Sequence, residues 1–114
     1  MPYLKIQTTV SADIAKKKSF LAKASASIAE QLGKPERYMM AAMDTDCIMT
    51  LGGGDDPSAF VELKGLDLSE SQTAGLSDTI CRLLLLELGI RPDRVYIIFS
   101  DIPRAMWGWD GGTF

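Results

Sequence analysis

The first residues of the chain alternate between apolar and polar side chains, whereas apolar residues farther along recur every three or four positions. The alternation over residues 1–6, which starts directly after a proline, predicts a strand that begins at the second residue. The later spacing predicts an amphipathic helix that is capped by Ser11 and ends at Gly33. The apolar face of this helix consists of Ile14, Leu21, Ala24, Ile28 and Leu32.

The stretch from Tyr38 to Met43 is apolar throughout. Such a run predicts a second strand that lies inside a sheet covered on both faces. Residues 48–51 are expected to pair nearby, before Gly52–Pro57 breaks the chain as a turn. The glycines of this turn resemble a phosphate loop only superficially, because no Lys-Ser or Lys-Thr pair follows them and two aspartates would repel phosphate.

The second half of the sequence repeats the first with an offset of 57 positions. Residues 91–96 echo residues 34–38, since each segment reads as a basic residue, proline, an acidic residue, arginine and the start of an apolar strand. We therefore expect one domain over residues 1–114, with pseudo-repeat halves of about 1–57 and 58–114.

The repeat defines a fold class. Residues 59–64 predict a third strand, and Ser69 and Gln72 form a capping box for a second helix that runs to Gly89. Two tandem β-α-β units, each with a right-handed crossover between parallel strands, then form a two-layer α/β sandwich. The fold class is therefore α+β. In this arrangement both helices cover one face of a four-stranded mixed sheet.

The other face of this sheet needs cover, because its strands look too apolar to face water. Other subunits would supply that cover most simply. The C-terminal segment Met106–Trp109 is expected to form a small added strand that reaches a neighbouring subunit.

Composition restricts the classes of function. With 46% apolar and 24% charged residues, the chain is a globular protein, and its net charge of −3 without a basic patch argues against nucleic acid as a partner. Histidine is absent, and Cys47 and Cys81 match no zinc or redox spacing, so we expect reduced core cysteines and no metal site. The sequence shows neither a membrane span nor a signal peptide, so we expect no membrane partner and a cytoplasmic location.

The Met1-Pro2 start is a candidate for chemistry. Removal of Met1 would leave a secondary amine at the end of a strand. An α-amino group titrates near ~7.7–8, and burial or a nearby cation lowers that pKa further, which gives a base at neutral pH. The alternative is a terminus that frays in solvent. The six residues alone leave both interpretations open.

A wider set of residues carries a resemblance to a known family. In order and spacing these residues are Met1-Pro2, Gly33-Lys34-Pro35 with Tyr38, Gly52-Gly53, Pro92–Ile97, and Gly108-Trp109 with Thr113-Phe114. Together they resemble the macrophage migration inhibitory factor (MIF) family of the tautomerase superfamily, over essentially the whole chain. The resemblance implies a homotrimer whose sheets surround a central channel, with active sites between subunits.

The resemblance also implies an activity, that of a cofactor-independent keto–enol tautomerase acting on a phenylpyruvate-like aryl α-keto acid. Pro2 would be the catalytic base, and Lys34 would hold the substrate carboxylate and depress the pKa of the proline. Leu66 would contact the substrate through its backbone N–H, and the adjacent subunit would contribute Tyr96. The other expected substrate-binding residues are Tyr3, Tyr38, Trp109 and Phe114. Without the resemblance, Lys34 reads as a solvated helix-end cation and the aromatic residues as packing residues.

Departures from the family pattern leave a second class of function open. Cytokine members carry a C-x-x-C pair where this chain has Ser58–Val61, and an asparagine where it has Ile98, while Ser100 and Trp107 also differ in size. These changes should alter substrate preference and rate. The alternative function is a cytokine-like trimer that binds a protein receptor, has a weak tautomerase pocket and leaves the cell without a signal peptide. Nothing in the sequence independently supports it.

Overall fold

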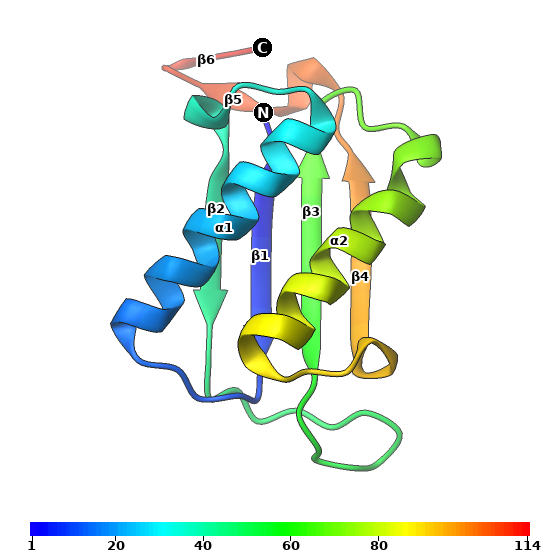
Figure 1. The fold of residues 1–114 in the computed structure, drawn as a ribbon. Helices are drawn as coiled ribbons and strands as arrows, with labels where there is room; N and C mark the ends of the chain where they lie inside the picture. The colour runs from blue at the N-terminus through cyan, green and yellow to red at the C-terminus, as the bar shows by residue number, and fades with distance from the viewer.

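The structure, a computed structural model, describes residues 1–114 and contains two layers, a four-stranded sheet and two helices that both lie on one of its faces (Figure 1). This arrangement confirms the predicted α+β sandwich. The elements are β1 (Tyr3–Thr8), α1 (Ile14–Leu32), η1 (Glu36–Tyr38), β2 (Met40–Asp44), β3 (Ala59–Gly65), α2 (Glu70–Leu88), η2 (Pro92–Arg94), β4 (Val95–Asp101), η3 (Arg104–Met106), β5 (Gly108–Trp109) and β6 (Gly112–Thr113), where η denotes a short 3₁₀ helix.

The strands are ordered β2-β1-β3-β4. Within each β-α-β unit the two strands are parallel, and the units meet where β1 runs antiparallel to β3. At the centre of this junction Lys5 faces Glu62, its own repeat equivalent 57 positions later. A pseudo-twofold axis therefore passes between these two residues and relates one end of the sheet to the other.

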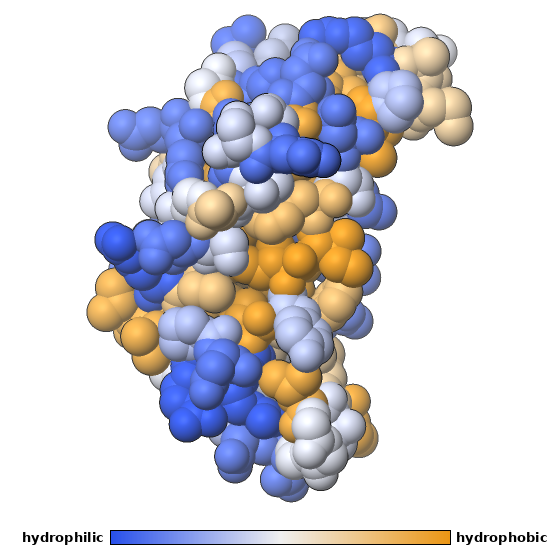
Figure 2. Space-filling view, turned by 90° about the vertical axis from the view of Figure 1, so that its right-hand side faces the viewer, coloured by the Kyte–Doolittle hydropathy of each residue, from blue (hydrophilic) through white to orange (hydrophobic).

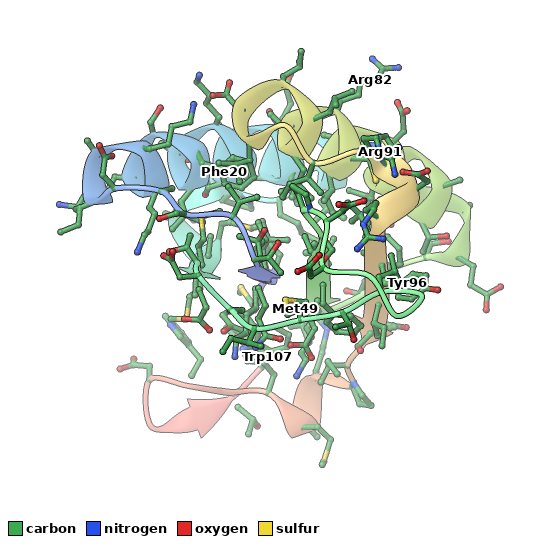
Figure 3. All side chains as sticks on the ribbon, turned by 90° about the horizontal axis from the view of Figure 1, so that it is seen from below. Phe20, Met49, Arg82, Arg91, Tyr96 and Trp107 are labelled. Atoms are coloured by element: carbon green, nitrogen blue, oxygen red, sulfur yellow. The ribbon has the colours of Figure 1, made fainter.

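The core lies between the helices and the sheet. Every second residue of β1 and β3 is buried there, including Leu4, Ile6, Val61 and Leu63, as the alternation requires. Phe20 of α1 points into the same layer (Figure 3). Each large apolar side chain buried in this way contributes about 1.5–3 kcal/mol. The helix residues that complete the core are Ala24, Ile28, Leu76, Ile80 and Leu84.

The cap of α1 differs from the prediction. Asp13, not Ser11, is the N-cap, and its carboxylate accepts a hydrogen bond of 2.8 Å from the Lys16 N–H. A negatively charged cap also complements the positive end of the helix dipole, which explains why aspartate takes this place.

The other predicted helix boundaries are confirmed. The Ser69–Gln72 capping box is formed at the start of α2. Gly33 and Gly89 end the two helices at φ values of 67° and 68°, in the left-handed region that glycine adopts without strain.

The second strand begins later than predicted and lies at the edge of the sheet. Residues Glu36–Tyr38 form η1, so β2 starts at Met40 and pairs only with β1. The prediction of an interior strand is wrong because apolar composition on both sides also suits an edge that another chain covers.

The segment after β2 does not join the four-stranded sheet. Leu51 forms one isolated bridge, to Gly54. Gly52 and Gly53 form the two-residue turn between them at φ values of 61° and 79°. The predicted turn is therefore confirmed, and of residues 48–51 only Leu51 pairs nearby, through this single bridge.

The face of the sheet that no helix covers is not uniformly apolar, so that prediction is wrong. Its two central strands present polar residues such as Lys5 and Glu62, because the outward positions of β1 and β3 alternate with the core. Exposed apolar side chains gather at the edges instead: Met40 on β2, and Tyr96 and Ile98 on β4. Figure 2, which views the β4 side, shows an apolar band across its middle.

The prediction for the cysteines also needs correction. Cys47 and Cys81 are both free thiols, but each is half-buried and neither belongs to the core. The predicted small strand in the C-terminal segment is present as β5, which pairs with β6 in a hairpin at the Pro2 end of the sheet. Its contact with a neighbouring subunit stays a prediction. Neither long helix combines the length and the apolar character that crossing a membrane would require.

Candidate active site

Pro2 lies at the start of β1, where two hollows in the surface meet. Its carbonyl accepts a hydrogen bond of 3.0 Å from the Met40 N–H, which ties it to the edge strand β2. Its ring is fully buried. Met1 and Pro2 line both hollows, which favours the interpretation of a fixed terminus over the alternative of one that frays in solvent.

The smaller hollow contains Lys34 and Leu66 beside Pro2. The end of α1 fixes Lys34, because Gly33 turns the chain back and the Lys34 N–H then donates to the Ala29 carbonyl at 3.0 Å. The remaining lining residues are Leu32, Leu63, Lys64, Gly65 and Leu68.

The loop that carries Leu66 is held from two sides. Asp101 accepts a hydrogen bond of 3.2 Å from the Leu68 N–H, and Arg104 forms an ion pair of 2.8 Å with Asp67. Leu66 itself is buried, and none of the backbone hydrogen bonds outside the helices and strands uses its N–H. That N–H is therefore a donor without a backbone acceptor, next to Pro2.

The larger hollow is an open cleft of about 720 Å³ between the end of the sheet and the C-terminal hairpin. Its wall is aromatic: Trp109 stacks on Phe114 with ring centroids 5.3 Å apart, and meets the Tyr38 ring edge-on at 6.1 Å. Trp107 lies in the same region, on the helix-free side of the sheet (Figure 3). The other lining residues are Tyr3, Arg37, Met39, Met40, Lys64, Ile102, Met106 and Gly108.

The surroundings of the chain terminus favour a neutral amine. Burial lowers the pKa of the Met1 amino group below its ordinary value, and the positive charges of Lys34 and Arg104 lower it further. Asp67 acts in the opposite direction. An amine in this place therefore loses its proton more readily than an exposed one.

Tyr96 is the predicted site residue that the single chain does not bring to the site. It lies on the outer strand β4 and lines neither hollow (Figure 3). Its side chain is 62% exposed, so it is available to another molecule. The other predicted residues all line one hollow or the other.

Sequence reasoning missed two basic residues of the site, Arg37 and Lys64. Lys64 pairs directly with Tyr3 across β1 and β3, so an antiparallel register for the two central strands would have placed it beside Pro2. Arg37 precedes Tyr38, and its guanidinium lies 4.7 Å from the centre of that ring. No signal in the local pattern distinguishes it from a surface arginine.

Tandem β-α-β units that meet in a four-stranded mixed sheet, with a proline at the first strand and a basic and aromatic pocket around it, define a protein of the tautomerase superfamily. The chain matches the family model "Macrophage migration inhibitory factor (MIF)" over residues 1–114, and it belongs to that family.

Individual relatives agree with this assignment. Macrophage migration inhibitory factor from Mus musculus is 36% identical over 96 residues, which covers 83% of this chain and 84% of the relative. The homologue from Brugia malayi is 34% identical over 115 residues, covering 100% and 99%. The crystal structure of the homologue from Prochlorococcus marinus superposes with a TM-score of 0.94 at 39% identity, covering 98% of each chain.

Proposed function

We propose that this protein is a cofactor-independent keto–enol tautomerase of aryl α-keto acids, with Pro2 as its general base after removal of Met1. The observation that carries the proposal is the place of Pro2, which is buried and hydrogen-bonded through its carbonyl where the basic hollow and the aromatic cleft meet. A secondary amine fixed there points in one direction and sits beside groups that favour its neutral form.

The reaction moves one proton. The Pro2 nitrogen removes a proton from the carbon next to the keto group, and the electrons of that C–H bond form the carbon–carbon double bond of the enol. The electron pair of the C=O double bond moves to oxygen, which takes up a proton. The substrate and product have the same composition, so no oxidant, reductant or cofactor is needed.

Lys34 and Leu66 stabilise the charges of this step. Lys34 pairs with the substrate carboxylate, and its charge helps to keep the Pro2 nitrogen unprotonated. The unused Leu66 N–H donates to the oxygen on which negative charge develops. The aromatic wall of Tyr38, Trp109 and Phe114 packs against the aryl group.

We infer that the working form is a homotrimer. The apolar edges at Met40 and at Tyr96 and Ile98 require cover that one chain does not supply. Contact between such edges of two subunits brings Tyr96 to the cleft of its neighbour. A stable monomer in light scattering at micromolar concentration would contradict this.

The test is an ultraviolet assay of phenylpyruvate tautomerisation on three preparations of known intact mass. The first is processed protein with Pro2 at its N-terminus, the second is the same chain with Met1 retained, and the third is Pro2→Gly. Retained Met1 turns the Pro2 nitrogen into an amide, so the contribution of the general base, about 10²–10⁴-fold, should be lost.

The Pro2→Gly preparation is the matched control, because it keeps a terminal amine but loses the ring that directs it. We expect its activity to fall between those of the other two. Equal rates for the processed and the Met1-retaining protein would exclude Pro2 as the base.

A further inference from the structure

Three basic side chains line the two hollows around Pro2, and no acidic side chain lines either one. Lys34 borders the smaller hollow, Arg37 borders the larger cleft, and Lys64 borders both. The chain as a whole has 15 acidic and 12 basic residues. The basic lining is therefore a local feature that runs against the overall charge of the protein.

None of these three charges is neutralised within the chain. The ion pairs of the structure use other basic residues, namely Lys5, Lys16, Lys23, Arg82, Arg91 and Arg104. The guanidinium of Arg37 rests over the Tyr38 ring, a contact that leaves its N–H groups free. Like charges gathered in a cleft repel one another, and an anionic ligand removes that repulsion.

One carboxylate does not account for all three. A monocarboxylic keto acid that reacts at Pro2 places its single carboxylate beside Lys34, in the smaller hollow. Arg37 lies elsewhere, next to Tyr38 on the aromatic wall of the larger cleft. Lys64 borders both spaces, so a ligand that extends from one into the other passes it.

We propose that the substrate of this site is a dianion, an aryl α-keto acid that carries a second carboxylate on its aryl end. Lys34 holds the α-keto carboxylate, while Arg37, assisted by Lys64, holds the second one. A guanidinium suits this role because its N–H groups match both oxygens of a carboxylate. The assignment of the α-keto acid end rests on the function proposed above, whereas the second anionic subsite rests on the cleft itself.

Binding of unreactive compounds tests the subsite independently of catalysis. 4-Carboxyphenylacetate carries two carboxylates, and 4-methylphenylacetate is a similar molecule with one. Calorimetric titration of the processed protein should show about tenfold tighter binding of the dicarboxylate, and the preference should shrink as salt is added. Equal affinity, or no binding of either compound, overturns the proposal.

Variants assign the preference to named residues. Arg37→Gln and Lys64→Gln should each reduce the tenfold preference severalfold, and the double variant should abolish it. Lys17→Gln is the matched control, because it removes one positive charge from α1 without touching either hollow. A preference that survives in the double variant, or disappears equally in the control, contradicts the assignment.

Kinetics separate this inference from the proposed function. Phenylpyruvate and 4-carboxyphenylpyruvate are compared by kcat/KM under the same conditions. Turnover of both at equal efficiency supports the tautomerase and overturns the dianion subsite. Preferential binding of the dicarboxylate without turnover of either keto acid supports the subsite and overturns the tautomerase.

Discussion

The two ends of the pseudo-symmetric sheet carry the same sequence pattern in different surroundings. Arg37 and Arg94 are repeat equivalents, 57 positions apart. Arg94 donates hydrogen bonds of 3.0–3.3 Å to four backbone carbonyls of one loop, those of Leu51, Gly54, Asp56 and Pro57. Arg37 donates none within the chain and rests on the Tyr38 ring beside an open cleft.

The neighbouring basic residues differ in the same way. Arg91 forms an ion pair of 3.3 Å with Asp93, whereas its equivalent Lys34 has no carboxylate partner and borders the smaller hollow. The strand starts differ as well. Ala59, the equivalent of Pro2, follows Ser58 in a continuous buried peptide, and the Ser58 carbonyl accepts a hydrogen bond of 2.8 Å from the Thr8 hydroxyl.

This contrast separates structural from functional uses of one motif. At the η2 end, both cations of the repeat bind groups of the chain itself, and Arg94 holds the loop of residues 51–57 in place. At the η1 end, the equivalent cations have no hydrogen-bond acceptor or carboxylate partner within the chain and line the hollows around Pro2. A repeat pattern that makes both ends alike in sequence thus leaves only one of them with unused binding capacity.

Among the basic residues of the two ends, the largest effect should come from removing Lys34 at the η1 end, which is the open end of the sheet. In the proposed function Lys34 holds the substrate carboxylate, so Lys34→Ala should lower kcat/KM for phenylpyruvate about 10–100-fold. Lys34 lowers the pKa of the Met1 amine, and we expect it to act in the same direction on the nitrogen of processed Pro2, so its loss should raise the pKa of the proposed base. Because the proposed base acts as a neutral amine, the rising limb of the pH–rate profile should move to higher pH.

The repeat equivalent supplies the control for this experiment. Arg91→Ala removes a cation from the other end of the sheet, where it pairs with an exposed aspartate. Both the rate and the pH profile should stay as in the unmodified protein. An unchanged Michaelis constant and pH profile in Lys34→Ala would make Lys34 a surface cation like Arg91.

Local sequence pattern was sufficient for most of the fold. The alternation of β1 and β3, the capping box at Ser69 and the left-handed glycines at Gly33 and Gly89 all depend on neighbouring residues, and the structure has them as predicted. The edge position of β2 was missed because strand order depends on contacts between distant segments. No local pattern contains that information.

The residues of the candidate site also differ in whether local sequence could predict them. Pro2 draws attention from its position alone, but Lys34 and Leu66 were singled out by family resemblance. Lys64 enters the site only through its register with Tyr3, and Arg37 only through the packing of η1 against the C-terminal hairpin. Charges that several elements bring together are visible only once those elements are placed.

A second way to test the comparison is to weaken the η2 end of the sheet, where the cations are bound within the chain. Arg94→Ala removes four hydrogen bonds from a charged donor to the loop of residues 51–57, and we expect a loss of about 2 kcal/mol in the free energy of unfolding. Arg37→Ala, the equivalent change at the open end, should alter stability by less than about 0.5 kcal/mol. Urea unfolding of both variants at one protein concentration measures the difference.

Arg94→Lys sharpens this result. A lysine keeps the charge but lacks the planar fork that reaches several carbonyls, so its stability should lie closer to that of Arg94→Ala than to the unmodified protein. Equal stability of Arg94→Ala and Arg37→Ala would mean that the loop contacts contribute nothing and that the two ends do not differ in this respect.

The smallest expected effect concerns the ion pair beside the open end. Asp67 raises the pKa of the terminal amine and Arg104 lowers it, and we expect both charges to act in the same directions on the nitrogen of processed Pro2. Asp67→Asn should therefore move the rising limb of the pH–rate profile to lower pH, and Arg104→Gln should move it to higher pH. Because both side chains are exposed and screened, each shift should be small. Asparagine suits position 67, since it tolerates the positive φ of 56° there.

The double variant should return the limb close to its original place. Shifts of the two single variants in the same direction would show that the pair acts by holding the Leu66 loop, and not through its charges.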